Sequence, residues 1–161
     1  LKVTATLNQT SVDLIEISGG TYFPGSKSAL DSTTDRPYFK NFAKRARSAT
    51  SKPMLTGGIK TRAQEQEAVI NGTADAVGLG RALALESTLS NLWLENQMPE
   101  PMFPRFLDVP EGGITAWYTM RLADIGAELE TDNNGDLRQA IFDYEIRDNK
   151  QATIWVRHFS G

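Results

Sequence analysis

The sequence has no cysteine and only one histidine among its 161 residues. The absence of cysteine excludes disulfides, cysteine-ligated zinc and iron–sulfur clusters. One histidine cannot form a histidine-based metal site by itself, so a metal would have to be held by carboxylates. We therefore predict no metal site. We expect His158, which stands in an aromatic segment near the carboxyl end, to be a packing or surface residue.

The sequence also lacks a surplus of positive charge and a long apolar run. Its 20 acidic and 17 basic side chains give a net charge of −3, which argues against a general nucleic-acid-binding protein. No apolar run approaches the roughly 20 residues of a membrane helix, and the first residues do not resemble a signal peptide. We expect a soluble, cytoplasmic protein without nucleic-acid or membrane partners. Because Leu1 is not an initiator methionine, we also expect the chain to begin inside a longer or processed product.

A cluster of basic residues lies between positions 40 and 52. Its members are Lys40, Lys44, Arg45, Arg47 and Lys52. We interpret them as the solvated face of a helix, and contact with an anionic partner is the alternative. The negative net charge and the lack of interleaved aromatic residues favour the solvated face.

Strand, loop and helix alternate three times in the first part of the chain. The expected elements are the last turns of a helix (1–11), a strand (12–17), a long loop (21–36), a helix opened by Pro37, a strand (53–56), a helix (61–71), a strand (74–79) and a helix (82–86) that extends or restarts toward 96. Alternation at this spacing is typical of parallel βα units. The predicted fold class is therefore α/β.

The pattern changes after Met98. Prolines at positions 99, 101 and 104 interrupt any helix or central strand. Two helices are predicted beyond them, over 114–129 and 137–156, with a turn at 131–135 between them. We expect one domain over 1–96 and a mostly helical C-terminal extension over 97–161.

Apolar spacing within three of the expected helices also predicts which side chains are buried. The candidates are Phe39, Phe42, Ala43 and Ala46 in the helix opened by Pro37, Trp117, Met120, Leu122 and Ile125 in the helix over 114–129, and Ile141, Phe142, Tyr144, Ile146 and Trp155 in the helix over 137–156.

Two glycine turns, Gly57-Gly58 and Gly80-Arg81, each follow an expected strand and precede an expected helix. Backbone N–H groups at such a turn favour a phosphate, and glycine removes the Cβ that would block its approach. In an eight-stranded βα barrel, the loops after the seventh and eighth strands often form a joint phosphate site. Arg81 adds a planar fork of donors. The alternative is that the glycines only permit tight turns and that Arg81 is solvated.

Three segments together resemble the Old Yellow Enzyme, or NADH:flavin oxidoreductase, family of FMN-dependent (β/α)₈ barrels. They are residues 12–22 (VDLIEISGGTY), 56–59 (TGGI) and 75–83 (DAVGLGRAL). They look like the sixth, seventh and eighth strands with the turns that follow. The resemblance implies that residues 1–96 are the C-terminal part of a TIM barrel, strands 6–8 with their helices. The tail beyond Met98 matches less distinctly.

The resemblance also implies roles for individual residues. Gly57, Gly58, Gly80 and Arg81 would hold the FMN phosphate. The Ser18-Gly19-Gly20 loop would lie near the active-site mouth, where Tyr22 and Phe23 either border the substrate or are packing aromatics. The family's substrate-binding His-His or His-Asn pair and its tyrosine proton donor come from earlier strands, so we assign no catalytic residue to this chain.

The function implied by the resemblance is an FMN-dependent NAD(P)H oxidoreductase that reduces activated C=C bonds of α,β-unsaturated carbonyl compounds. Some relatives carry an iron–sulfur cluster bound by cysteines. Because this chain has no cysteine, the resemblance implies that it is more similar to the simple ene-reductases. We expect the N-terminal half of the barrel to be supplied by another polypeptide and this chain alone to be inactive. Two alternatives remain open: another phosphate-binding TIM-barrel enzyme, such as an aldolase or isomerase, and a noncatalytic half-barrel or interaction module.

Overall fold

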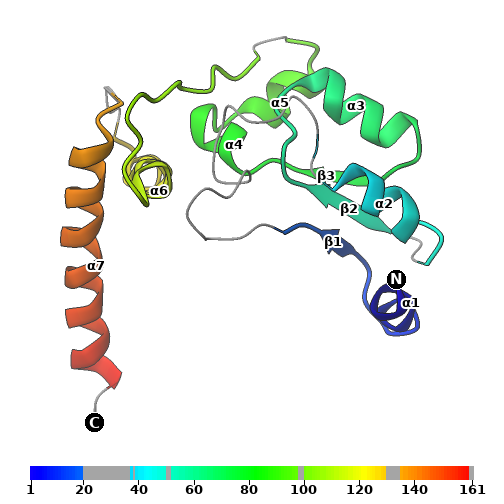
Figure 1. The fold of residues 1–161 in the computed structure, drawn as a ribbon, viewed down its shortest axis with the longest axis horizontal. Helices are drawn as coiled ribbons and strands as arrows, with labels where there is room; N and C mark the ends of the chain where they lie inside the picture. Colours follow the sequence, from blue (N-terminus) through cyan, green and yellow to red (C-terminus); the bar gives the residue numbers. More distant parts are fainter. Residues whose placement is uncertain (20–36, 38, 50–51, 98–99, 130–134, 160–161) are drawn as a thin grey trace. The chain divides into compact units, whose positions relative to one another are not determined.

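The computed structural model describes residues 1–19, 37, 39–49, 52–97, 100–129 and 135–159. The chain divides into two compact units, Leu1–Phe103 and Pro104–Gly161, whose helices and strands are labelled in Figure 1. The first unit contains α1 (Lys2–Leu7), β1 (Ile15–Ile17), α2 (Lys40–Ala46), β2 (Pro53–Thr56), α3 (Arg62–Ile70), β3 (Ala76–Gly78), α4 (Arg81–Leu85) and α5 (Leu89–Leu94), and the second contains α6 (Gly113–Gly126) and α7 (Leu137–Phe159).

The three strands of the first unit form a parallel sheet in the order β1-β2-β3. Ile17 pairs with Leu55, and Leu55 pairs with Val77, so these three side chains lie on the same face of the sheet. The predicted small parallel sheet with intervening helices is confirmed. The fold of this unit is mixed α/β.

Helices α2 and α3 pack against that face and form the main core with it. Its buried members are Ile17, Ala43, Ala46, Leu55, Ile59, Ala68 and Ala74, with Phe39, Val77 and Leu79 packed at the edge. Leu55 is fully buried at the centre. Burial of one such side chain contributes about 1.5–3 kcal/mol to folding.

The opposite face of the sheet is less covered. Met54, Thr56, Ala76 and Gly78 alternate with the core residues along β2 and β3, and all four are only half-buried. The two faces therefore differ: one is packed against helices, and the other carries half-buried residues.

The helix predicted to extend or restart toward residue 96 restarts. Helix α4 ends at Leu85, Glu86 takes an extended conformation (φ −140°, ψ 98°), and α5 begins at Leu89. A second, smaller core lies here. It consists of the buried residues Ala82, Leu89 and Trp93, against which Leu79, Leu83 and Phe103 pack.

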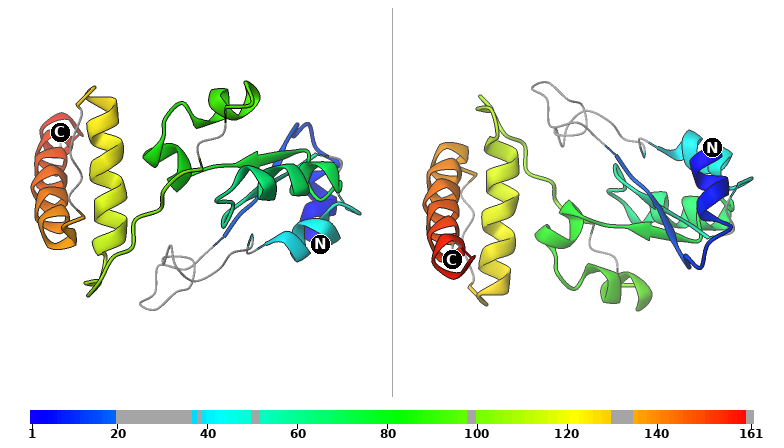
Figure 2. Two further views of the ribbon diagram at one scale, coloured as in Figure 1. Left: turned by 90° about the horizontal axis from the view of Figure 1, so that it is seen from above. Right: turned by 90° about the horizontal axis from the view of Figure 1, so that it is seen from below.

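The second unit is built on the contact between α6 and α7, which lie side by side in both views of Figure 2. Close packing at the start of both helices requires Gly113, because a Cβ there would come within 3.1 Å of Leu137 Cβ and 3.0 Å of Pro110 Cγ. Trp117 is buried and makes edge-to-face contacts with Phe106 and Tyr118, at centroid distances of 5.4 and 4.9 Å. The buried core of the unit consists of Ile114, Ala116, Trp117, Tyr118, Leu137 and Ala140.

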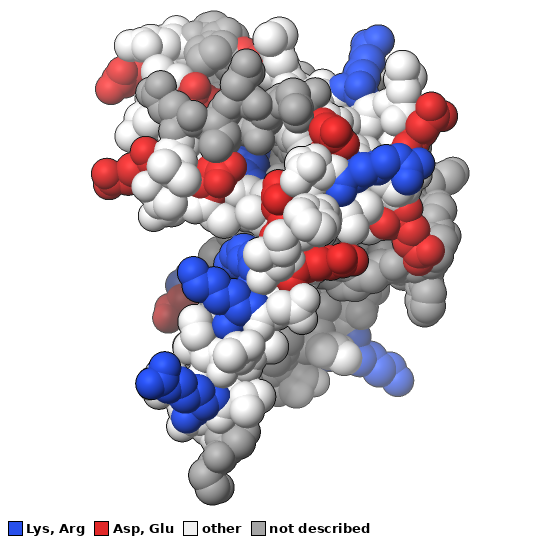
Figure 3. All heavy atoms as spheres, turned by 90° about the vertical axis from the view of Figure 1, so that its left-hand side faces the viewer, with Lys and Arg blue, Asp and Glu red and all other residues white. Residues whose placement is uncertain are grey.

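Several side chains that were predicted to be buried are exposed. They are Phe42, Leu122, Phe142, Ile146 and Trp155. Helix α7 is longer than α6, and its buried residues are Leu137 and Ala140 in its first turn. The apolar spacing within α7 does not show how much of its length α6 covers. Figure 3 shows one face of the structure, on which uncharged side chains are interspersed with basic and acidic ones.

Three of the five residues of the basic cluster, Lys40, Arg47 and Lys52, form ion pairs with carboxylates. Lys40 contacts Glu67 at 2.5 Å, Lys52 contacts Asp13 at 3.6 Å, and Arg47 forms an ion pair with Asp75. These pairs are solvent-accessible, so each contributes little stability. The single histidine, His158, is exposed in the last turn of α7. None of the helices in the described segments is long and apolar enough to cross a membrane.

Candidate functional site

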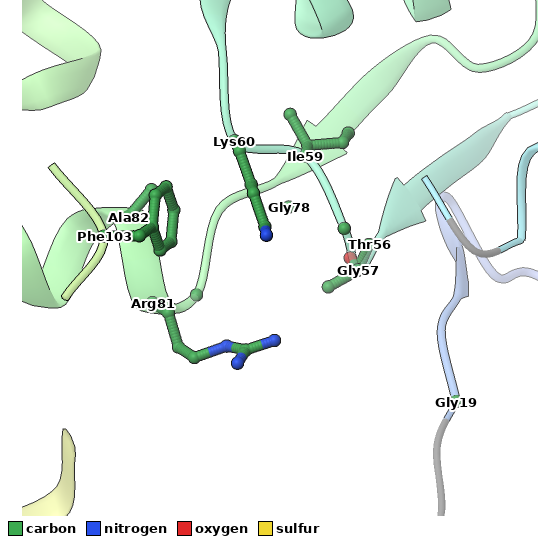
Figure 4. Close-up of a pocket in the computed structure, with 11 residues that line it drawn as sticks. Gly19, Thr56, Gly57, Ile59, Lys60, Gly78, Arg81, Ala82 and Phe103 are labelled. Carbon is green, nitrogen blue, oxygen red and sulfur yellow. The ribbon is translucent and has the colours of Figure 1, made fainter. Parts of the chain in front are cut away.

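A cavity of about 230 Å³ lies at the carboxyl ends of the three strands (Figure 4). In open parallel sheets, ligands bind at this edge because the loops that follow the strands converge there. The lining comes from the loops after all three strands and from the segment that ends the first unit: Gly19, Thr56, Gly57, Gly58, Ile59, Lys60, Gly78, Gly80, Arg81, Ala82 and Phe103.

The four residues predicted to hold a phosphate, Gly57, Gly58, Gly80 and Arg81, all line this one cavity. The structure therefore brings the two glycine turns together, as the spacing predicted. Of the residues predicted near the active-site mouth, Gly19 also lines the cavity. Gly20, Tyr22 and Phe23 lie outside the described residues.

The turn after β2 has a backbone conformation that favours glycine. Gly57 has φ 104° and Gly58 has φ 76°. An L residue with a side chain rarely adopts such angles, and strain of this kind costs on the order of 1–3 kcal/mol. These two glycines let the chain turn sharply from β2 into the loop that carries Lys60.

Gly78 and Gly80, on and after β3, are glycines for different reasons. A Cβ on Gly78 would lie 2.1 Å from Thr56 Oγ1, so the side chain of Thr56 occupies the space beside it. A Cβ on Gly80 would meet no atom within 4 Å. Because Gly80 lines the cavity, a side chain there would take up cavity space without a clash.

Two cationic side chains point into the cavity, Lys60 from the loop after β2 and Arg81 from the start of α4. Figure 4 shows the Lys60 ammonium and the Arg81 guanidinium both directed toward the open space beside Gly57. No aspartate or glutamate is among the described residues that line the cavity. The charge of the lining is therefore positive, which favours an anionic ligand.

The hydroxyl of Thr56 adds a polar group to the lining. Thr56 Oγ1 is buried and has no hydrogen-bond partner among the described residues. A buried polar group without a partner costs about 1–3 kcal/mol. A ligand oxygen in the cavity is the kind of partner that would satisfy it.

The start of α3 is occupied by its own side chains. Thr61 Oγ1 accepts a hydrogen bond from the backbone N–H of Gln64 at 3.2 Å. In return, the side-chain oxygen Oε1 of Gln64 accepts hydrogen bonds from the backbone N–H groups of Lys60 and Thr61, at 2.7 and 3.2 Å. This capping box satisfies the backbone N–H groups of Lys60, Thr61 and Gln64 within the protein. The binding capacity of this loop therefore rests on the glycine turn and on Lys60.

Sequence reasoning assigned no individual role to six residues of the cavity: Thr56, Ile59, Lys60, Gly78, Ala82 and Phe103. Lys60 follows the glycine turn and directly precedes the helix cap, which is a signal that could have pointed to it. Phe103 belongs to the proline-rich segment that the sequence analysis placed beyond the α/β domain. No local pattern around Phe103 indicates its place in the cavity.

Comparison with known proteins gives a partial likeness. No family model and no solved structure matches the chain. The chain is 33% identical over 93 residues to the NADH-dependent flavin oxidoreductase iliE of Hypocrea jecorina (strain QM6a), and the alignment covers 52% of this chain and 23% of that protein. The chain thus spans about a quarter of the length of this relative. The likeness supports a flavin oxidoreductase kind of function.

Proposed function

We propose that this chain is the C-terminal part of an FMN-dependent NAD(P)H oxidoreductase of the Old Yellow Enzyme type. In this proposal, β1, β2 and β3 are the sixth to eighth strands of a TIM barrel, residues 1–96 belong to that barrel, and residues 97–161 are an extension of it. The sheet face that carries Met54, Thr56, Ala76 and Gly78 would be the barrel interior. The remaining strands would come from an N-terminal half supplied by other polypeptide.

One observation carries the proposal: both glycine turns and Arg81 line a single positively charged cavity at the carboxyl ends of parallel strands. The volume of about 230 Å³ lies below the roughly 300 Å³ at which pockets begin to enclose a whole drug-sized ligand. The cavity therefore suits the phosphate end of a flavin mononucleotide, with the ring system extending beyond it.

The residues present fit an FMN phosphate. Gly57, Gly58 and Gly80 would allow close approach of its oxygens, Arg81 would form charge-assisted hydrogen bonds with them, and the Thr56 hydroxyl would donate to one. When bound, FMN supplies hydride transfer between a nicotinamide and an activated C=C bond of an α,β-unsaturated carbonyl compound. This chain's part is to hold the cofactor. The groups that bind the substrate and donate the proton would lie on the N-terminal half.

The proposal is tested by titrating the purified chain with FMN and following quenching of flavin fluorescence. The chain should bind FMN. Gly80→Ala should weaken binding about tenfold or more, because its methyl group would take up cavity space where a phosphate oxygen would approach. It should leave the chain folded, since the new Cβ meets no atom within 4 Å.

Gly126→Ala is the matched control, because a Cβ there also meets no atom within 4 Å and Gly126 ends α6, outside the cavity lining. It should bind FMN like the unchanged chain. A folded chain that does not bind FMN would overturn the proposal. Binding of inorganic phosphate with no preference for FMN would instead favour another phosphate-binding barrel enzyme.

A further inference from the structure

Lys60 and Phe103 form a contact at the edge of the cavity that the proposed function does not use. The Lys60 ammonium lies 5.4 Å from the centroid of the Phe103 ring, and both side chains line the cavity (Figure 4). At this distance the ring quadrupole attracts the cation. The contact joins the loop after β2 to the segment that ends the first unit.

The backbone of Lys60 is fixed on its other side. Its amide N–H donates to Gln64 Oε1 at 2.7 Å, so the first turn of α3 holds the residue in place. The side chain of Lys60 extends from this fixed backbone, and its ammonium group lies over the Phe103 ring. The contact with the ring thereby limits the orientations of a long, flexible lysine side chain.

The ring that holds Lys60 is itself anchored. Phe103 packs against the small core that contains Leu89 and Trp93. Three residues earlier, the Glu100 carboxylate accepts a hydrogen bond from the Arg62 amide, at 3.3 and 3.4 Å from its two oxygens. The segment 100–103 is thus attached both to α5 and to the start of α3.

The charge of a phosphate monoester explains why a second cation would be useful. Such a group carries about −1.5 to −2 charges at pH 7, and Arg81 supplies only one positive charge. We propose that Lys60, positioned by Phe103, is a second cationic contact for the FMN phosphate and that this pair selects FMN over uncharged riboflavin. This inference rests on the proposed function and adds to it a residue that determines cofactor selectivity.

The test compares the dissociation constants of FMN and riboflavin for the full chain and its variants. Lys60→Gln should weaken FMN binding about tenfold, as expected for the loss of a contact between charged groups, and leave riboflavin binding unchanged. Lys60→Arg should retain most of the selectivity. The matched control is Lys44→Gln, which makes the same change of charge on an exposed residue of α2 and should change neither constant.

Phe103→Leu tests the positioning role, since leucine keeps apolar bulk but removes the ring. It should weaken FMN binding less than Lys60→Gln does. In the Lys60→Gln background it should have no further effect on FMN, because a residue that acts through Lys60 has nothing left to position. Additive losses in the double variant would overturn the positioning role.

The failure of this inference can be told apart from the failure of the proposed function. If the unchanged chain does not bind FMN, both the proposed function and the role of Lys60 are overturned. If the unchanged chain binds FMN and Lys60→Gln binds it equally well, only the role of Lys60 is overturned. Equal weakening of FMN and riboflavin would also overturn it, because Lys60 would then not contact the phosphate. Circular dichroism of each variant shows whether the fold is retained.

Discussion

At the scale of single residues, Thr56 combines a cost in stability with a proposed use in binding. Its Oγ1 is buried without a hydrogen-bond partner among the described residues, and the residue lines the cavity. Buried hydroxyls without partners destabilise a fold, because they lose hydrogen bonds to water and gain none in return. Such a group at a cavity is expected where a ligand supplies the missing partner.

Thr56→Val tests this directly, because a methyl group replaces the hydroxyl at nearly the same volume. The free energy of unfolding of the ligand-free chain should rise by about 1 kcal/mol, since the unsatisfied hydroxyl is removed. FMN affinity should fall severalfold at the same time, since a donor to the phosphate is lost. Urea unfolding and fluorescence titration measure the two effects. A variant that gains stability and keeps its FMN affinity would show that the hydroxyl has no part in binding.

The two glycine turns and Arg81 could be recognised in the sequence, whereas Thr56 and Phe103 could not. Gly57 and Gly58 take positive φ angles that favour glycine, so two consecutive glycines in the sequence already indicate a turn. The importance of Thr56 and Phe103 depends on neighbours that are distant in sequence. Thr56 abuts Gly78 on another strand, and Phe103 contacts Lys60 from a different loop.

At the scale of elements, the strands and helices with strong local signals were predicted most closely. Strand β2 has the predicted bounds, and α3 begins after its cap residue Thr61 and ends before Asn71, within the predicted range. Strands β1 and β3 are shorter than the apolar runs that suggested them. Length of pairing depends on the neighbouring strand, which a single run of residues does not specify.

The capping box of α3 gives a prediction for an element. Thr61→Ala removes the side-chain acceptor for the Gln64 amide and should lower the free energy of unfolding by about 1 kcal/mol. It should also weaken FMN binding modestly, because the cap fixes the backbone of Lys60. The matched control is Thr6→Ala in α1, whose hydroxyl bonds to a carbonyl within its helix. Thr6→Ala should stay within about 0.5 kcal/mol of the unchanged chain, and equal losses in both variants would contradict the role of the cap.

At the scale of the whole molecule, the division of the chain into barrel portion and extension stays a prediction. The parallel order of the strands followed from the alternation of strand and helix signals. The burial of the tail did not follow, because four of its side chains predicted to be buried, among them Trp155, are exposed. A helix pattern shows which side is apolar but not how much of that side a partner covers. In α7 the rings of Trp155 and Phe159, which are tilted by 33° with centroids 4.3 Å apart, are exposed.

The exposed rings of α7 predict a measurable surface property. The chain should enhance the fluorescence of the dye ANS, which binds exposed apolar surface. Replacing both Trp155 and Phe159 by glutamine should lower that enhancement, because the adjacent rings form an apolar surface. Stability should change by less than about 0.5 kcal/mol, since both side chains are exposed. Val3→Gln, at another exposed apolar residue, is the control. An unchanged ANS signal in the double variant would contradict the prediction.

The close approach of Thr56 to Gly78 has a consequence for how the sequence can vary. These residues face each other in register on neighbouring strands, and the side chain of one fills the room beside the other. The space that the side chains at positions 56 and 78 share is therefore limited, so the size allowed at one position depends on the size of the other. Alanine at position 78 would be accommodated once position 56 carries a smaller side chain, so substitutions at the two positions would occur together in evolution.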